Sequence, residues 1–230
     1  MKRELIGETR LDSTITSYES IKYAKTDEGT SVYADALCGD GSSMVTEFIY
    51  WSDYYNSIIS PFYSYSTGRT KSTVRSSLTT CRDIDGDGVI EIPKDASNKK
   101  QASEITTQNW VSYGNTVLSH KCYSLACKRD GYILVVGDDD FSKIKASYDS
   151  EKRKLELTNK KNNKKAIEII TLINSSYSEN DPKYEDYSLV MKNSGFVYLA
   201  KADSSSGIDI NIKKLRDMIK VYCFRRYMYE

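Results

Sequence analysis

An acidic, glycine-containing segment at residues 83 to 91 carries the clearest chemical signal in the chain. It reads DIDGDGVIE, so carboxylates stand at positions 1, 3, 5 and 9 of a short loop. Ca²⁺ takes about six to eight oxygen ligands, and this alternating spacing lets carboxylates from one loop converge on a single ion. Gly88, at position 6, suits the unusual backbone angle that such a tight loop needs. The predicted ligands are Asp83, Asp85, Asp87, the main-chain carbonyl of Val89, and Glu91.

Two other interpretations of this loop remain open. Asp and Gly also form plain turns without a metal, because they satisfy nearby backbone hydrogen bonds. Against a metal-free turn, the loop's carboxylates repel one another, and the local sequence offers only Arg82 and Lys94 at its edges. Mg²⁺ is the other alternative, but it demands a strict octahedron and prefers to keep its waters. We therefore expect Ca²⁺ as the cofactor.

The residues that flank the loop predict strands and not the paired helices of an EF-hand. Position 12, where an EF-hand has a bidentate glutamate, is Lys94. Ile92 precedes Pro93, and the residue before a proline disfavours helical geometry. We expect the loop to follow a strand at residues 72–82 and to join it to another extended segment.

The strand-flanked sequence RDIDGDGVIEIP resembles the calcium loop of FG-GAP or VCBS-type repeats, which are β-propeller blades of integrin α chains and many bacterial surface proteins. The wider segment from MVTEFIYW through the loop, residues 44–93, is also similar to the propeller-like part of uncharacterised lipoproteins from Gram-positive gut bacteria. The resemblance implies a structural metal and a C-terminal α+β domain of unknown role. A propeller needs about four blades or more, so the resemblance implies either a piece of a longer protein or a blade-like unit packed on a second domain.

The first part of the chain predicts short antiparallel strands. Residues 30–37 and 43–51 flank a turn that contains glycine, as in a hairpin. Both faces of the second of these strands are largely apolar, so we expect it to be covered on two sides. A polar, unpatterned stretch begins near residue 94 and indicates a linker. We expect a β-rich, blade-like domain with the calcium loop at 1–95, a linker at 96–104, and an α+β domain at 105–230.

The second part predicts more strands and a final helix. Asp209 is the expected cap of that helix. Its apolar stripe at helical spacing comprises Ile212, Leu215, Ile219, Tyr222 and Cys223. The expected strands are 108–113 and 116–125 around Gly114-Asn115, then 132–136, 141–148, 153–157, 166–173, 187–191 and 195–200. The expected fold class is α+β, predominantly β, with an antiparallel blade-like sheet followed by an α+β domain.

Charge and composition limit the classes of binding partner that we expect. The chain has 230 residues with 33 Lys and Arg against 32 Asp and Glu, a formal charge of +1, so its overall field does not favour nucleic acid. The lysine-rich run NKKNNKK contains no aromatic residue for stacking on bases. The 19 tyrosines include exposed-looking groups at 53–55 and 62–65, which suit a protein or carbohydrate partner or serve as cover for a sheet.

Other candidate catalytic groups are isolated. His120 is the single histidine and lies in a predicted strand, where a core or edge role is expected. Ser97 and Lys100 match an S-x-x-K pattern without its partner motifs. Asp138, Asp139 and Asp140 could serve a cell-envelope hydrolase or a second cation, but consecutive residues do not converge, and a solvated turn is expected.

The cysteines and the N-terminal sequence bear on the compartment. The five cysteines are odd in number and contain no C-x-x-C pair, so a disulfide framework is not indicated, although a bridge between Cys122 and Cys127 is conceivable. The first twenty residues have no apolar stretch typical of a signal peptide, and no window is long and apolar enough for a membrane span. An extracellular or surface location therefore requires an export signal upstream, in a longer protein.

Together these observations predict a non-enzymatic, calcium-binding structural or binding module of a bacterial cell-surface or extracellular protein. Two alternatives stay open: a cell-envelope hydrolase that uses a carboxylate cluster, and a metal-free intracellular interaction protein.

Overall fold

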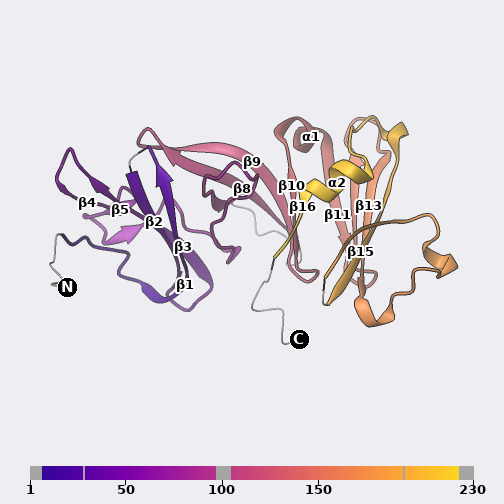
Figure 1. Cartoon of the computed structure of the whole chain (residues 1–230), viewed down its shortest axis with the longest axis horizontal. Helices are drawn as coiled ribbons and strands as arrows, with labels where there is room; N and C mark the ends of the chain where they lie inside the picture. The colour runs from indigo at the N-terminus through magenta and orange to yellow at the C-terminus, as the bar shows by residue number, and fades with distance from the viewer. Residues whose placement is uncertain (1–6, 28, 97–104, 194, 223–230) are drawn as a thin grey trace. The chain divides into compact units, whose positions relative to one another are not determined.

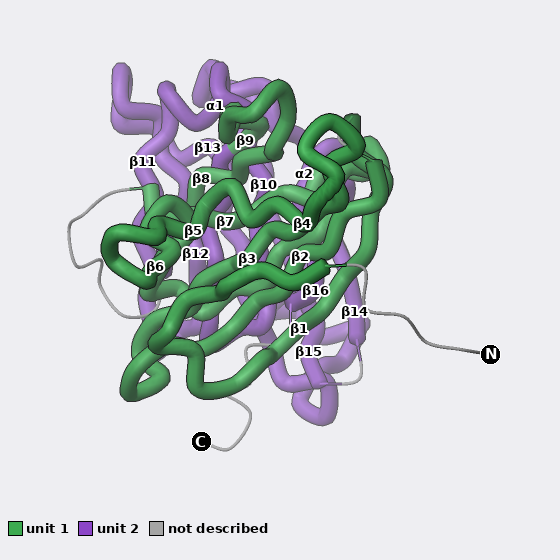
Figure 2. Tube along the Cα trace, turned by 90° about the vertical axis from the view of Figure 1, so that its left-hand side faces the viewer, with its two compact units in different colours: residues 1–98, 108–122 green, residues 99–107, 123–230 purple. Residues whose placement is uncertain are grey.

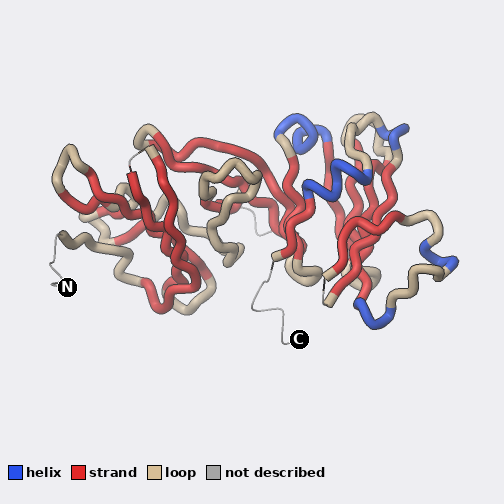
Figure 3. Tube along the Cα trace, in the orientation of Figure 1, coloured by secondary structure: helices blue, strands red, loops and turns tan. Residues whose placement is uncertain are grey.

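The computed structural model describes residues 7–27, 29–96, 105–193 and 195–222. The expected predominantly β character is confirmed, since antiparallel strands make up most of the chain and the helices are short (Figures 1 and 3). The chain forms two compact units: residues 1–98 with 108–122, and residues 99–107 with 123–230 (Figure 2). Residues 108–122, which we assigned to the second domain, belong to unit 1 because their strand pairs with residues 92–95. The expected linker at 96–104 lies, apart from Ala96, outside the described residues.

Unit 1 contains a four-stranded antiparallel meander. Its strands pair in chain order: β1 (Ile15–Thr26), β2 (Gly29–Cys38), β3 (Ser43–Ser52) and β4 (Ser57–Ile59) (Figure 1). The hairpin predicted for β2 and β3 is confirmed, and its turn has Gly39 and Gly41 at φ of 59° and 78°, which glycine adopts without strain. A two-stranded sheet follows, made of β5 (Tyr63–Ser64) and β6 (Arg69–Thr70).

Aromatic rings form the core beneath this meander. Phe48 on β3 is fully buried, and its ring centroid lies 4.9 Å from that of Tyr33 and 4.6 Å from that of Tyr113. Buried Ile92, which follows the acidic loop directly, belongs to the same cluster. Tyrosine adds large apolar area with a polar tip, and five of the described tyrosines are buried in the cores of the two units: Tyr33, Tyr50, Tyr113, Tyr132 and Tyr198.

The prediction of a strand at residues 72–82 is wrong. This segment alternates between buried and exposed side chains as a strand does, but within it only Arg75 and Arg82 form isolated bridges, to Met44 and Glu91. The face turned inward is polar, with Thr73, Arg75, Ser77 and Thr79 buried, while Val74 is exposed. Side chains satisfy part of this backbone in place of a neighbouring strand: Arg75 Nε donates to the Thr79 carbonyl at 2.7 Å. Leu78 at φ 51° interrupts the extended path.

A third sheet has five strands. Its order is β16 (Ile219–Val221), β10 (Tyr132–Val136), β9 (Val117–Cys127), β8 (Ile105–Gly114) and β7 (Ile92–Asp95). The predicted hairpin of β8 and β9 is present, with its turn one residue later than expected, at Asn115 and Thr116. Both have positive φ, 49° and 64°, as a type I′ turn requires. The predicted strand at β10 is confirmed, and Ile133, Leu134 and Val136 are fully buried.

Unit 2 is built on a second five-stranded sheet. Its order is β11 (Ile144–Asp149), β12 (Lys154–Asn159), β13 (Lys165–Ile173), β15 (Phe196–Ala202) and β14 (Ser188–Lys192). The predicted pairing of the segments now seen as β11 with β12 and β14 with β15 is confirmed. One face packs on β9, β10 and helix α2 (Ile212–Met218), and the other is covered by the segment between β13 and β14. Single 3₁₀ turns lie at Asn174–Ser176, Pro182–Tyr184 and Ser204–Ser206.

The C-terminal helix is shorter than predicted. Helix α2 spans Ile212–Met218, and Asn211, not Asp209, caps it by accepting a hydrogen bond from the Lys214 amide at 2.9 Å. Ile219, expected on the helical stripe, instead begins β16, which pairs with β10. Apolar spacing did not distinguish the two outcomes because Leu215 and Ile219 are buried in the same core either way.

Two further expectations concern cysteines and membranes. Cys122 and Cys127 are not joined by a disulfide bond, and Cys38 and Cys81 are buried thiols outside any disulfide. Cys223 lies outside the described residues. Over the described part of the chain, no helix has the length and apolar character needed to cross a membrane.

A charged cluster on the β12–β13 pair stabilises unit 2. Glu156 and Glu168 stand directly opposite each other, which would be unfavourable for like charges alone. Lys165 Nζ lies 2.6 Å from Glu168 and 2.8 Å from Glu156, and Tyr187 donates its hydroxyl to Glu168. Burial opposes ionisation of Glu168, but Lys165, Tyr187 and Lys154 outweigh it and lower its pKa to about 2.

We expect Glu168→Gln to destabilise unit 2 at pH 7 by up to about 3 kcal/mol, which is the pKa difference expressed as free energy. Because the folded pKa lies below the ordinary value of 4.5, the stabilisation is present above pH 4.5 and is lost as pH falls toward 2. Urea denaturation between pH 2 and 7 measures this, with the exposed Glu179→Gln as control. An acid transition that is equally steep in Glu168→Gln and wild type would contradict the assignment.

Candidate metal centre

The acidic loop is closed at its base by a pair of backbone hydrogen bonds. Arg82 N donates to the Glu91 carbonyl at 3.0 Å, and Glu91 N donates to the Arg82 carbonyl at 2.9 Å. Gly86 and Gly88 have φ of 88° and 85° within the loop, a region that other residues rarely adopt. The chain can therefore leave and return at one point, and β7 begins immediately after Glu91.

Hydrogen bonds within the loop fix the aspartates. Asp83 accepts from the amides of Gly86 and Gly88, at 2.7 and 3.0 Å. Asp85 Oδ1 accepts from the Asp87 amide at 3.2 Å, as expected of an Asx turn. These bonds constrain the side chains without using all of the carboxylate lone pairs.

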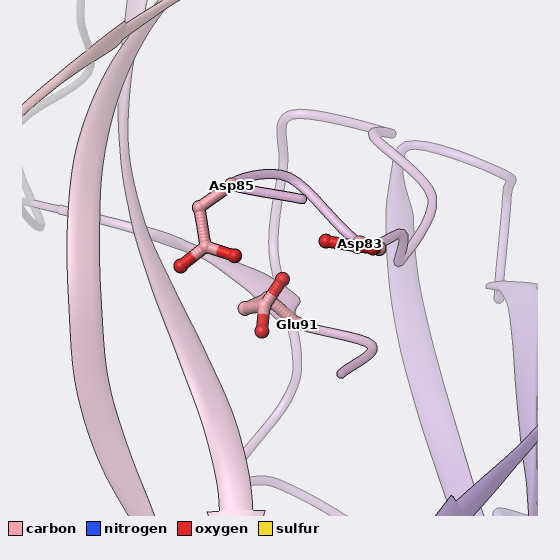
Figure 4. A group of neighbouring side chains, drawn as sticks. All are labelled: Asp83, Asp85 and Glu91. Carbon is pink, nitrogen blue, oxygen red and sulfur yellow. The ribbon is translucent and has the colours of Figure 1, made fainter. Parts of the chain in front are cut away.

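Three of the predicted ligands come together. Carboxylate oxygens of Asp83, Asp85 and Glu91 all lie within 4.8 Å of one another, and Figure 4 shows the three side chains pointing toward a common centre. Asp83 and Asp85 are exposed, whereas Glu91 is fully buried. In the described part of the chain, this is the single group of three or more His, Cys, Asp or Glu residues with that spacing.

Glu91 is the unusual member of the group. Its Oε2 accepts from the Ile84 amide at 2.9 Å, but its buried Oε1 has no hydrogen-bond partner among the described residues. Burial, reinforced by the negative charges of Asp85, Asp87 and Asp83, raises the pKa of Glu91 to about 7 despite the bond from Ile84. A buried, unpaired carboxylate oxygen is costly unless a cation or proton satisfies it.

Asp87 lies outside this group. Its Oδ2 is 2.8 Å from Lys121 Nζ on β9, and its Oδ1 accepts from the Val89 amide at 2.8 Å. The hydrogen bond from Lys121 lowers the pKa of Asp87. The expectation that only Arg82 and Lys94 flank the loop's charge is thus wrong. The sequence did not predict this contact, because Lys121 is 34 residues from Asp87 along the chain and the order of the strands brings the two together.

The other candidates do not assemble into a second site. His120 is exposed, and its Nδ1 lies 2.5 Å from Asn109 Oδ1 on the paired strand, as an edge histidine would. Asp138, Asp139 and Asp140 form the first turn of helix α1 (Asp138–Lys143), and Asp140 pairs with Lys214 at 2.8 Å. Ser97 and Lys100 lie outside the described residues. The role of the Val89 carbonyl stays a prediction.

Tyrosines near the predicted recognition loops are exposed. Tyr54 and Tyr55 are 88% and 68% exposed and meet edge to face at the β3–β4 turn, and Tyr65 is 75% exposed. Their partner, if any, stays a prediction. The chain matches no protein-family model, no curated protein and no solved structure.

Proposed function

We propose that the protein is a calcium-binding structural module in which one ion stabilises the 83–91 loop within unit 1. The observation that carries this proposal is Glu91: its carboxylate is fully buried, one of its oxygens has no hydrogen-bond partner among the described residues, and the carboxylate lies within 4.8 Å of those of Asp83 and Asp85. A divalent cation supplies both the missing partner and the charge balance.

The ligand atoms indicate which cation fits. All are oxygens, which excludes the soft sites typical of copper or iron–sulfur clusters and favours hard cations. Asp83, Asp85 and Glu91 would hold the ion, with the Val89 carbonyl and water as further ligands, and with Asp87 once it is released from Lys121. An open loop with exposed Asp83 and Asp85 suits Ca²⁺, which tolerates six to eight ligands in flexible geometry, better than Mg²⁺.

A structural role follows from where the ion would lie. Glu91 precedes β7 directly, and the Arg82–Glu91 bridge joins the end of the 72–82 segment to the start of that strand. Calcium would fix this junction and add no catalytic group. Extracellular calcium modules work at about 10⁻⁴ to 10⁻³ M, a range that an exposed loop of this kind can meet, which supports a surface or extracellular location. A protein or carbohydrate partner remains part of this proposal through the exposed Tyr54 and Tyr55.

We expect calorimetric titration to show one calcium site, and the melting temperature of unit 1 to rise with calcium concentration. At 100 times the dissociation constant the gain is about 2.7 kcal/mol, which corresponds to several degrees. Asp85→Asn should greatly weaken both effects, because it removes a converging charge from an exposed position.

The matched control is Asp209→Asn, which makes the same change at an exposed position of unit 2. It should bind calcium as the wild type does. Titration with Mg²⁺ should give much weaker binding. The absence of calcium-dependent heat and of any shift in melting temperature would contradict the proposed function.

A further inference from the structure

An ion pair crosses from the acidic loop to strand β9. Lys121 Nζ lies 2.8 Å from Asp87 Oδ2, and both side chains are about one-third exposed. Both residues belong to unit 1. Asp87 is the fourth carboxylate of the predicted ligand set, and in this structure it is bonded to Lys121. An effect of Lys121 on the calcium affinity of this loop rests on the proposed function, because it concerns the same site.

The strand register places Lys121 here. β7 pairs with β8 from Ile92 opposite Val111, and the tight turn at Asn115 and Thr116 returns the chain along β8 as β9. Lys121 thus lies in the same sheet as β7, which carries the loop's C-terminal end. The ion pair with Asp87 positions its ammonium group beside the loop.

The charge of Lys121 acts on the whole cluster. Its pKa is raised, first by the hydrogen bond to Asp87 and further by the charges of Asp87, Asp85 and Glu91. The ammonium therefore interacts favourably with the same carboxylates that would bind a cation. Asp87 is bonded to Lys121 through one oxygen and to the Val89 amide through the other, and in this position its carboxylate lies outside the Asp83, Asp85 and Glu91 group.

We propose that Lys121 is an internal competitor of the metal ion, which sets the calcium affinity of the loop by holding Asp87 out of the ligand set. Calcium binding and the ion pair exclude each other in part. By thermodynamic linkage, the ion pair weakens calcium binding by the same free energy by which bound calcium weakens the Lys121–Asp87 interaction. Removing the ammonium frees Asp87 as a ligand and also removes a repelling charge.

The test is a calorimetric calcium titration of Lys121→Met, which keeps most of the side-chain stem and removes the charge. We expect the dissociation constant to fall about five-fold or more, within the usual range of coupling between sites. Lys121→Arg should stay close to the wild type. Lys25→Met, an exposed lysine of the same unit, is the matched control and should change affinity less than two-fold.

A double variant separates action through Asp87 from long-range charge. In an Asp87→Asn background, Lys121→Met should gain clearly less affinity than in the wild type, because the competing ion pair is already absent. An equal gain in both backgrounds would overturn the role of Asp87. Unchanged or weaker binding by Lys121→Met, with normal wild-type binding, would overturn the inference alone. If neither the wild type nor Lys121→Met binds calcium, the proposed function fails first.

A second readout follows the lysine itself. Acetic anhydride acylates a neutral amine, releasing acetate and a proton, and mass spectrometry quantifies the product at each lysine. Saturating calcium should speed acylation of Lys121 relative to Lys25, because Lys121 Nζ no longer donates to Asp87 Oδ2. Slower or unchanged labelling of Lys121 in calcium would contradict its release.

Discussion

Replacing Arg75 with methionine should destabilise unit 1 by about 3 to 5 kcal/mol, the usual result of removing one partner from a buried ion pair. Arg75 Nη2 lies 2.8 Å from Asp35 Oδ1, and both side chains are fully buried. The substitution leaves the Asp35 carboxylate without its counter-ion in a site that water does not reach. Chemical denaturation in urea, followed by circular dichroism, measures the loss.

The Arg75–Asp35 pair also holds the approach to the acidic loop. Arg75 Nη1 donates to Thr46 Oγ1 on β3 at 2.9 Å, and its Nε donates to the Thr79 carbonyl. Asp35 Oδ2 on β2 accepts from the Cys81 amide at 2.9 Å, two residues before Asp83. Buried side chains therefore hold the 72–82 segment in place of strand partners. Loss of the Arg75–Asp35 pair should disturb the acidic loop as well.

Two controls separate the buried pair from ordinary surface charge. Arg69→Met removes a half-exposed arginine that lies 3.3 Å from Asp12, and it should cost about 1 kcal/mol or less. Combining Asp35→Asn with Arg75→Met removes both charges, so the double variant should lose less stability than the sum of the single losses. Additive losses would show that the two side chains do not act as a pair. Should Arg75→Met fail to fold, Arg75→Lys, which keeps the charge, provides the measurable series.

Local sequence predicted the parts of this fold that depend on turns. The β2–β3 and β8–β9 hairpins follow from glycine and asparagine between alternating segments, whose backbone preferences act over a few residues. The acidic loop is of the same kind, because Asp83, Asp85 and Glu91 converge through local spacing and glycine angles.

The features that the sequence did not predict depend on distant partners. At 72–82 the sequence predicted a strand, but this segment contains a turn and a bend, and its inward side chains are polar; Arg75 binds Asp35 and Thr46 in place of a neighbouring strand. Ile219 joins β16 because the edge of β10 accepts it there. Lys121 reaches Asp87 only through strand order. In each case the deciding hydrogen bond joins residues far apart in the chain.

Glu91→Gln should change calcium affinity and calcium-free stability in opposite directions. With calcium, the variant loses the one buried charged ligand, and we expect the dissociation constant to rise about 100-fold or more, equivalent to about 2.8 kcal/mol. Without calcium at pH 8, the wild type carries an ionised carboxylate in a buried site next to Asp83 and Asp85, whereas glutamine is neutral. The variant should then be more stable than the wild type, by at most about 3 kcal/mol.

The geometry supports this substitution because glutamine is nearly isosteric. Its amide oxygen can accept from the Ile84 amide as Glu91 Oε2 does, and its NH₂ group then takes the place of the unpartnered Oε1 in a cluster that offers the carboxylates of Asp83 and Asp85 as acceptors. Melting curves at pH 8 over a calcium series should therefore cross, with the variant higher in chelator and the wild type higher in saturating calcium.

Asp85→Asn is the comparison that makes the Glu91 result specific to burial. It should weaken calcium binding as well, but Asp85 is exposed, so its neutralisation relieves little cost in the calcium-free protein. Because the folded pKa of Glu91 lies above its ordinary value, calcium-free wild type should lose stability as pH rises from about 4.5 to about 7, and Glu91→Gln should not. A Glu91→Gln protein that melts below the wild type in chelator at pH 8 would show that the buried carboxylate stabilises the empty loop. The cation would then not be needed to offset its charge.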